Sequence, residues 1–146
     1  MKKIIQTRIL LPYIAFAIIW TLIGHFFPLI HLLPTFIVLI IFFYFTDKYF
    51  PKISYSHIML NYVLILAIYL LFHKFGGGDS DDAGRGWIFL SFIASLVTSS
   101  SYMVVNAIAQ DIIWQDKIKY IGTMLISAII TFLICHKLLF GVFLFL

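Results

Sequence analysis

The stretch from Trp87 to Asp111 most constrains what this chain can fold into. It is apolar and long enough to cross a bilayer, whose hydrocarbon core of about 30 Å takes about 20 helical residues. Polar side chains nevertheless recur along it at intervals of three to four residues, which places them on one face of a helix. These residues are Ser91, Ser95, Ser99 (or its neighbour Thr98), Tyr102, Asn106 and Gln110. We therefore interpret the stretch as the polar spine of a small membrane protein.

The composition excludes a water-soluble domain. Apolar residues make up 63% of the chain and charged residues 11%, against about 45–50% and about 25% in soluble domains. The net charge of +4 does not indicate a nucleic-acid partner, because the basic residues are scattered at the ends of apolar runs. Such placement is typical of membrane proteins. We expect one transmembrane domain, residues 1–146, in a lipid bilayer.

Five apolar runs predict an all-α integral membrane protein with short loops. The predicted membrane spans are 9–27, 29–46, 57–73, 87–109 and 120–137. Pro12 then falls in the first turn of the first span, where a missing N–H costs little. Residues 9–46 are barely enough for two crossings at about 18 residues each. The alternative is therefore four crossings and a re-entrant segment at 29–46.

The basic residues predict the orientation. With five spans, seven Lys and Arg residues lie on one side and three on the other, and deleting the second crossing gives six against four. The seven are Lys2, Lys3, Arg8, Lys48, Lys52, Lys117 and Lys119, and the three are Lys74, Arg85 and Lys137. Basic loops favour the cytoplasm, so we expect the N-terminus inside and the C-terminus outside. The short loops and compact size favour a bacterial inner membrane.

Two further spans also have a polar or small face. In 120–137 the small residues are Gly122 or Thr123, then Ser127, Thr131 and Cys135, and in 57–73 the polar residues are His57, Asn61, Tyr69 and His73. Small residues let membrane helices approach closely, so we assign Thr123, Ser127 and Thr131 to helix packing. We expect no Asp, Glu, Lys or Arg deep in any span, which argues against a proton relay or an ion-coupled pump.

Four histidines are predicted at the outer ends of the spans: His25, His31, His73 and His136. His57 stands alone inside. The glycine-rich loop from Lys74 to Gly86 adds Asp79, Asp81 and Asp82 on the outer side, and histidine with carboxylate is a ligand set for zinc and related ions. A metal site or a pH-sensing cluster is thus geometrically possible. However, histidines are also common at membrane interfaces and no H-E-x-x-H or H-x-x-E-H spacing occurs. We predict no metal and no cofactor, with these four histidines as the candidate ligands.

Other motifs of known chemistry are missing or incomplete. The run from Asp79 begins like a calcium loop, but Ala83 and Leu90 occupy positions five and twelve, where ligands are needed. It is better interpreted as a solvated acidic loop. Cys135 is the sole cysteine, which excludes an intrachain disulfide. Phosphate loops and nucleophile elbows are absent, so we do not expect an enzyme.

Two functions from different classes fit these features. The first is a homo-oligomer that forms or gates a permeation path. Its axis would be lined by Ser95, Ser99, Tyr102 and Asn106, with Asp79, Asp81 and Asp82 at the mouth. The second is a non-conducting scaffold or sensor subunit of a larger complex, such as a defence or secretion system. Its partner would bind the polar spine and the apolar tail after Lys137, since an exposed apolar segment indicates an interaction surface. A metal-dependent membrane enzyme that uses the outer histidines is a third possibility.

Overall fold

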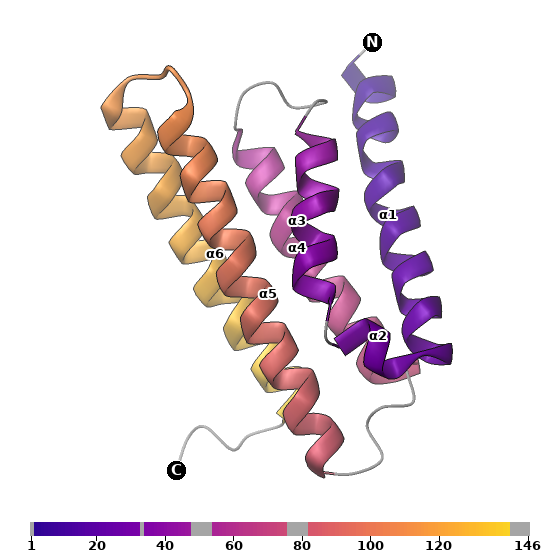
Figure 1. Cartoon of the computed structure of the whole chain (residues 1–146). Coiled ribbons are helices and arrows are strands. Elements are labelled where there is room, and N and C mark those ends of the chain that lie inside the picture. Colours follow the sequence, from indigo (N-terminus) through magenta and orange to yellow (C-terminus); the bar gives the residue numbers. More distant parts are fainter. Residues whose placement is uncertain (1, 33, 48–53, 76–81, 141–146) are drawn as a thin grey trace.

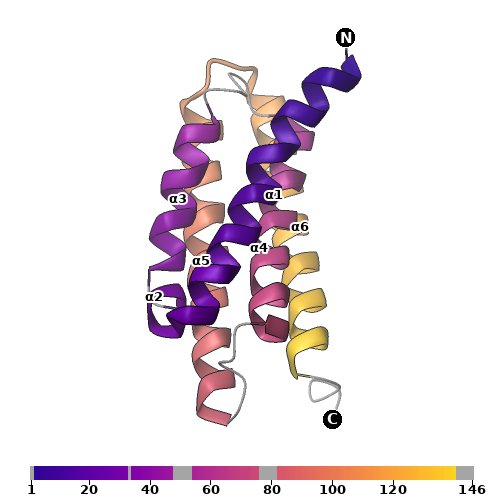
Figure 2. The same cartoon turned by 90° about the vertical axis from the view of Figure 1, so that its right-hand side faces the viewer.

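The computed structural model describes residues 2–32, 34–47, 54–75 and 82–140, and every regular element in these ranges is a helix. Five long helices lie side by side and alternate in direction, and a short helix precedes the second of them (Figures 1 and 2). They are α1 (Lys2–Phe26), α2 (Pro28–Leu32), α3 (Thr35–Thr46), α4 (Tyr55–Phe75), α5 (Asp82–Ala109) and α6 (Trp114–Phe140). The bundle has an N-terminal end, where α1 begins, and a C-terminal end, where α6 finishes.

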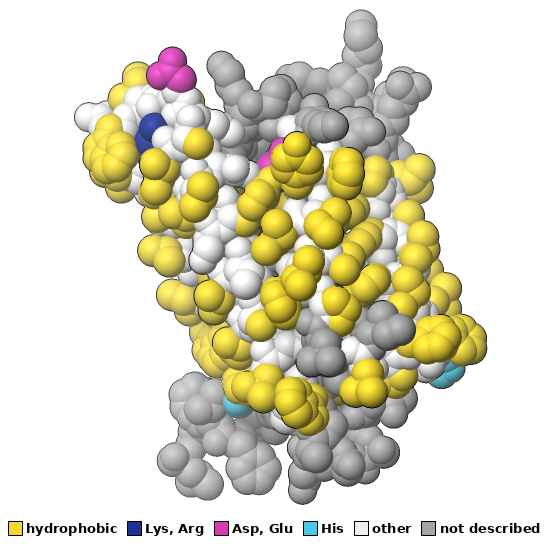
Figure 3. All heavy atoms as spheres, in the orientation of Figure 1, with side chains coloured by type: hydrophobic (Ala, Val, Ile, Leu, Met, Phe, Trp, Pro, Cys, Tyr) yellow, Lys and Arg dark blue, Asp and Glu magenta, His cyan; other side chains and the backbone are white. Residues whose placement is uncertain are grey.

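Three of the described helices are long and apolar enough to cross a membrane: Tyr55–Phe75, Gly86–Ala109 and Trp114–Leu138. They correspond to the predicted spans 57–73, 87–109 and 120–137 and are compatible with an integral membrane protein. Figure 3 shows hydrophobic side chains over the length of the visible face, with the coloured Asp, Glu, Lys and Arg residues near its upper end. The described apolar part of α1, Leu10–Phe26, is shorter. Helix α3 has 12 residues, about 18 Å of helix.

Within the predicted span 29–46, prolines mark the starts of two helices, α2 and α3. Pro28 is the first residue of α2, and Pro34 is the N-cap of α3. Both positions suit proline, which has no N–H to donate and a φ angle that matches the first turn of a helix. Across the break, the hydroxyl of Thr35 donates a hydrogen bond to the carbonyl oxygen of His31.

The helices α1 and α6 both begin earlier than the predicted spans. Helix α1 begins at Lys2, so Pro12 lies in its interior rather than in its first turn. Helix α6 begins at Trp114 and not near Tyr120, because Asp116 suits its first turn. The Nζ of Lys117 donates to the carbonyl oxygen of Ile108 at 2.7 Å, which caps the end of α5 and shortens the connection.

The loop predicted from Lys74 to Gly86 is shorter than expected. Helix α4 continues to Phe75 and α5 starts at Asp82, so residues 76–81 connect them. Asp79 and Asp81 lie outside the described residues. At the other end of α4, the Ser54 hydroxyl accepts a hydrogen bond from the His57 N–H at 3.2 Å, as an N-cap serine does.

Helix α4 is the centre of the bundle. It packs against α1, α5 and α6, while α3 packs against α5. The α4 side chains Ile65, Ile68, Tyr69 and Phe72 are fully buried. The share of buried residues in the most apolar stretch is 44% in α4 and only 22% in α6. Helix α6 is therefore a peripheral helix with most of its apolar surface outside the bundle.

Candidate functional site

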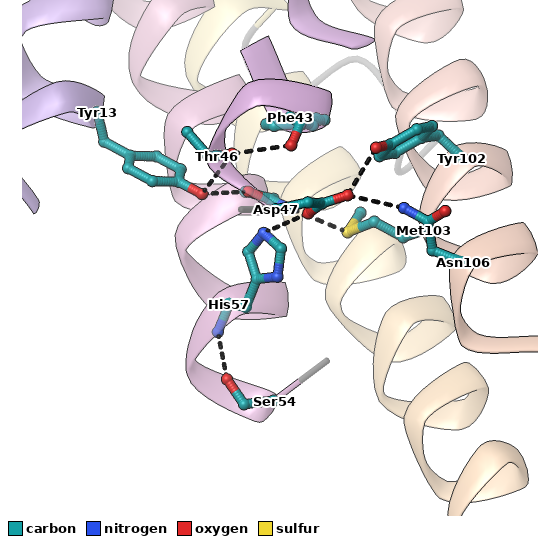
Figure 4. Close-up of polar contacts among 10 residues, drawn as sticks. Tyr13, Phe43, Thr46, Asp47, Ser54, His57, Tyr102, Met103 and Asn106 are labelled. Carbon is teal, nitrogen blue, oxygen red and sulfur yellow. Dashed lines mark hydrogen bonds and ion pairs between the residues drawn. The ribbon is translucent and has the colours of Figure 1, made fainter. Parts of the chain in front are cut away.

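A polar cluster surrounds Asp47, the residue that follows α3. Its backbone N–H donates to the carbonyl oxygen of Phe43 at 2.8 Å, which fixes the residue at the end of the helix. One carboxylate oxygen, Oδ2, accepts hydrogen bonds from the Tyr102 hydroxyl at 2.6 Å and from Asn106 Nδ2 at 2.9 Å. The other oxygen lies 3.3 Å from Nε2 of His57 (Figure 4). Residues from α4 and α5 thus converge on one carboxylate at the N-terminal end of the bundle.

A second layer of contacts extends this cluster to α1. The Tyr13 hydroxyl donates to Oδ1 of Asn61 at 2.9 Å and lies 3.4 Å from Oγ1 of Thr46. Nδ2 of Asn61 is 3.3 Å from the sulfur of Met103, and Figure 4 shows Tyr13 reaching in from the side opposite Tyr102. Asp47, Thr46, His57, Asn61, Tyr13, Tyr102, Met103 and Asn106 form what we call the Asp47 cluster. It ties together four helices that are distant in sequence.

The chemistry of the Asp47 cluster is that of a well-satisfied anion. Hydrogen bonds to a charged acceptor are short and stronger than those between neutral groups. The Asp47 side chain is 28% exposed and that of His57 is 5% exposed. The arrangement serves to hold the end of α3 against α4 and α5.

Asp47 is not among the site residues predicted from the sequence. It falls between the predicted spans 29–46 and 57–73. Its partners on α5 are 55 and 59 residues away in the chain, so no local spacing could indicate the contact. Tyr102 and Asn106, at the polar end of the α5 spine, did indicate that an acceptor lies nearby. Both are hydrogen-bond donors that need an acceptor when they leave water.

The polar spine of α5 faces the inside of the same chain. The Tyr69 hydroxyl lies 2.7 Å from the hydroxyls of both Ser91 and Ser95. Ser95 and Ser99 are fully buried, and the Ser99 hydroxyl has no hydrogen-bond partner among the described residues. Tyr102 and Asn106 bind Asp47, and Gln110 follows the last residue of α5. Ser91 and Ser95 therefore face α4, and Tyr102 and Asn106 face the end of α3.

The small face of α6 lies against the bundle. Ser127, Thr131 and Cys135 are buried, as is Met124, which comes before them in the helix, and α6 packs on α4 and α5. Thr123 is only half-buried. Its hydroxyl donates to the carbonyl oxygen of Lys119 at 2.9 Å, a bond within its own helix.

The outer histidines lie on four different helices at the C-terminal end. Nδ1 of His25 is 2.6 Å from the carbonyl oxygen of Phe75. His31 is fully buried and stacks on Phe72 with ring centroids 3.9 Å apart. His136 lies beside aromatic rings of α5 and α6, and His73 is near the end of α4. In the described ranges no three His, Cys, Asp or Glu residues come together to hold a metal ion. Of the acidic loop residues, only Asp82 is placed, as the first residue of α5.

No protein-family model matches this chain, and comparisons with curated proteins and with solved structures likewise find no match. Function therefore has to be inferred from the residues and contacts of this chain alone.

Proposed function

We propose that this protein is a non-conducting subunit of a larger membrane complex, in which it binds another membrane protein. One observation carries the proposal: the polar spine of α5 is used inside the chain. A homo-oligomeric axis lined by Ser95 and Ser99 would need these hydroxyls at the surface, but both are fully buried. Tyr102 and Asn106 are bound to Asp47 of the same chain. The polar groups that favoured a permeation path thus have a structural use.

Within this proposal the chain crosses a bacterial inner membrane five times, with its N-terminus in the cytoplasm and its C-terminus outside. The arrangement of the basic residues supports this orientation. Lys117 and Lys119 lie near the start of α6, at the bundle end where α1 begins, whereas Lys74 and Lys137 lie near the opposite end. The break between α2 and α3 is compatible with a crossing, because irregular backbone is tolerated at membrane depth where protein buries it.

The outer face of α6 is the surface that we propose for the partner. Large aliphatic side chains cover it, and each is half-exposed or more. They are Leu125, Ile126, Ile129, Ile130 and Leu133. A Cβ added at Gly122 would meet nothing within 4 Å, so no neighbour in the described part of the chain requires glycine there. Glycine inside a helix costs roughly 0.5–1 kcal/mol relative to alanine. Close approach of a second helix is a common reason for such a glycine in membranes.

Site-specific photocrosslinking in native membranes tests this proposal. A photoreactive side chain at Ile126 of α6 should give one defined adduct with another membrane protein. The matched control is Ile41 of α3, also an exposed isoleucine, which should give none. Gly122→Leu should abolish the Ile126 adduct, because the added side chain blocks the close approach.

The proposal is also tested by measuring conduction after the purified protein is reconstituted into liposomes. We expect ion and solute flux no greater than in protein-free liposomes. A closed homo-oligomer of identical chains in native mass spectrometry, together with flux that Ser99→Leu and Asn106→Leu abolish, would overturn the proposal.

A permeation path within the protomer is the second candidate, and unpartnered buried groups favour it. The Ser99 hydroxyl and both ring nitrogens of His31 are buried without hydrogen-bond partners among the described residues. Buried polar groups of this kind are commonly satisfied by ordered water. Water along the inner side of α5 would then supply the path. Two results together would favour this candidate. Photocrosslinking from Ile126 would give no adduct, and the liposomes would show a flux that Ser99→Leu blocks.

A further inference from the structure

Two neighbouring cavities lie in a groove between α1 and α4. The first has a volume of about 370 Å³ and is lined by Ile18, Thr21, Leu22, His25, Leu71 and Phe75. The second has a volume of about 220 Å³ and extends the groove toward Leu10 and Leu60. Ile18 and Leu71 line both cavities, so the two meet there. We call this feature the α1–α4 groove.

The length and width of the α1–α4 groove limit what can occupy it. It follows α1 from Leu10 to His25, a distance of about 22 Å at about 1.5 Å per residue. One leaflet of a hydrocarbon core of about 30 Å is about 15 Å thick, so an extended acyl chain fits along the groove. A second helix is about 10 Å across, and 22 Å of it would fill roughly 1,700 Å³. That is several times the volume of the cavities.

The C-terminal end of the groove carries polar and basic groups. Nδ1 of His25 donates to the carbonyl oxygen of Phe75 at 2.6 Å, since a carbonyl can only accept. This bond orients the imidazole and leaves Nε2 for another partner. The exposed ammonium of Lys74 lies 5.6 Å from the centroid of the Phe75 ring. Phe75 and His25 both line the groove, so a positive charge stands at its mouth, where a lipid phosphate would lie.

We propose that the α1–α4 groove binds one anionic phospholipid, with an acyl chain between α1 and α4 and the phosphate at Lys74 and His25. The apolar lining of the groove favours the acyl chain of the lipid, and the ammonium of Lys74 favours its phosphate. This site is independent of the partner surface proposed on α6.

Native mass spectrometry of the purified chain in detergent, titrated with phosphatidylglycerol, tests the site. We expect one tightly bound lipid per chain, and weaker binding of the zwitterionic phosphatidylcholine. Lys74→Gln should weaken phosphatidylglycerol binding about fivefold, the equivalent of about 1 kcal/mol for one basic residue at an anionic surface. The matched control is Lys137→Gln, a lysine near the same bundle end but on α6, which should leave binding unchanged.

Filling the groove tests the position of the acyl chain. Ile18→Trp should abolish retention of the lipid, and Leu22→Trp repeats the test from a second lining residue. The control Ile129→Trp changes an equally exposed isoleucine of α6 and should retain the lipid. Equal retention by Ile18→Trp, Leu22→Trp and Ile129→Trp would overturn the proposal. So would equal binding of phosphatidylcholine and phosphatidylglycerol.

Discussion

At the scale of single residues, Asp47 has the largest influence on how the helices are joined. A carboxylate that leaves water needs partners that replace its hydration. Asp47 finds them in Tyr102, Asn106 and His57, which come from two other helices. Tyr102 and Asn106 in turn depend on Asp47, because each would otherwise lack a strong acceptor at the edge of the apolar core. The pairing is therefore reciprocal.

Replacing Asp47 with alanine should destabilise the bundle. Asp47→Ala removes the acceptor shared by Tyr102 and Asn106 and leaves His57 without its carboxylate. Hydrogen bonds to charged groups contribute about 1.5–3 kcal/mol each, so we expect the free energy of unfolding to fall by about that amount or more. Equilibrium unfolding of the purified protein in mixed detergent micelles measures the change.

The control for this variant is Asp116→Ala. Asp116 pairs with Lys119 at 3.3 Å on the surface of α6, with both side chains at least half-exposed. Exposed pairs of this kind contribute about 0–1 kcal/mol. If Asp47→Ala costs no more than Asp116→Ala, the cluster does not hold the helices together.

At the scale of elements, the close approach of α1 to α2 and α4 depends on Gly24. A Cβ at this position would lie 2.6 Å from Cδ2 of His31 and 2.7 Å from Cδ2 of Phe72. Both of these rings are fully buried and stacked on each other. Neither ring can move without disturbing the other. The glycine thus lets the end of α1 lie against the helix break.

Gly24→Ala should therefore destabilise the protein. Overpacking of a filled core costs typically about 1–3 kcal/mol, which outweighs the gain in helix propensity of about 0.8–1 kcal/mol. The matched control is Gly122→Ala in α6, where the added methyl meets open space and only the gain in propensity should be observed. Thermal unfolding in detergent compares the two variants. Equal stabilisation by both alanines would show that α1 does not approach α2 and α4 so closely.

At the scale of the whole molecule, the direction of each helix determines which residues share a side of the membrane. The start of α6 lies at the same bundle end as the start of α1, and the end of α4 lies at the other. Cys135 is fully buried, so the native thiol should react little with polar reagents. Engineered cysteines can therefore report on the topology.

With five crossings, we expect Gln115→Cys and Lys74→Cys to react on opposite sides. In intact bacterial cells a membrane-impermeant maleimide should label Lys74→Cys, and should label Gln115→Cys only after lysis. Lys137→Cys should behave like Lys74→Cys, because both lie near the C-terminal end of the bundle. Labelling of Lys74→Cys and Gln115→Cys from the same side would contradict the proposed topology.

Much of the architecture could be predicted from the sequence, because the signals are local. The apolar runs that became α4, α5 and α6 are defined by their own length and composition. The predicted limits of α4 and the end of α5 lie within two residues of the structure. Helices α5 and α6 begin before the predicted spans 87–109 and 120–137, since charged and glycine-containing turns such as Asp82–Gly86 and Trp114–Lys119 can also be helical.

The sequence by itself determined that this chain is a set of apolar helices and that the polar residues of α5 share one face. Only the tertiary structure decided that this face points inward, with Ser91 and Ser95 at Tyr69 and with Tyr102 and Asn106 at Asp47. The helical period determines which residues share a face, but it carries no information on which segment packs against that face. That depends on how all the helices fill space together, as do the convergence on Asp47 and the groove between α1 and α4.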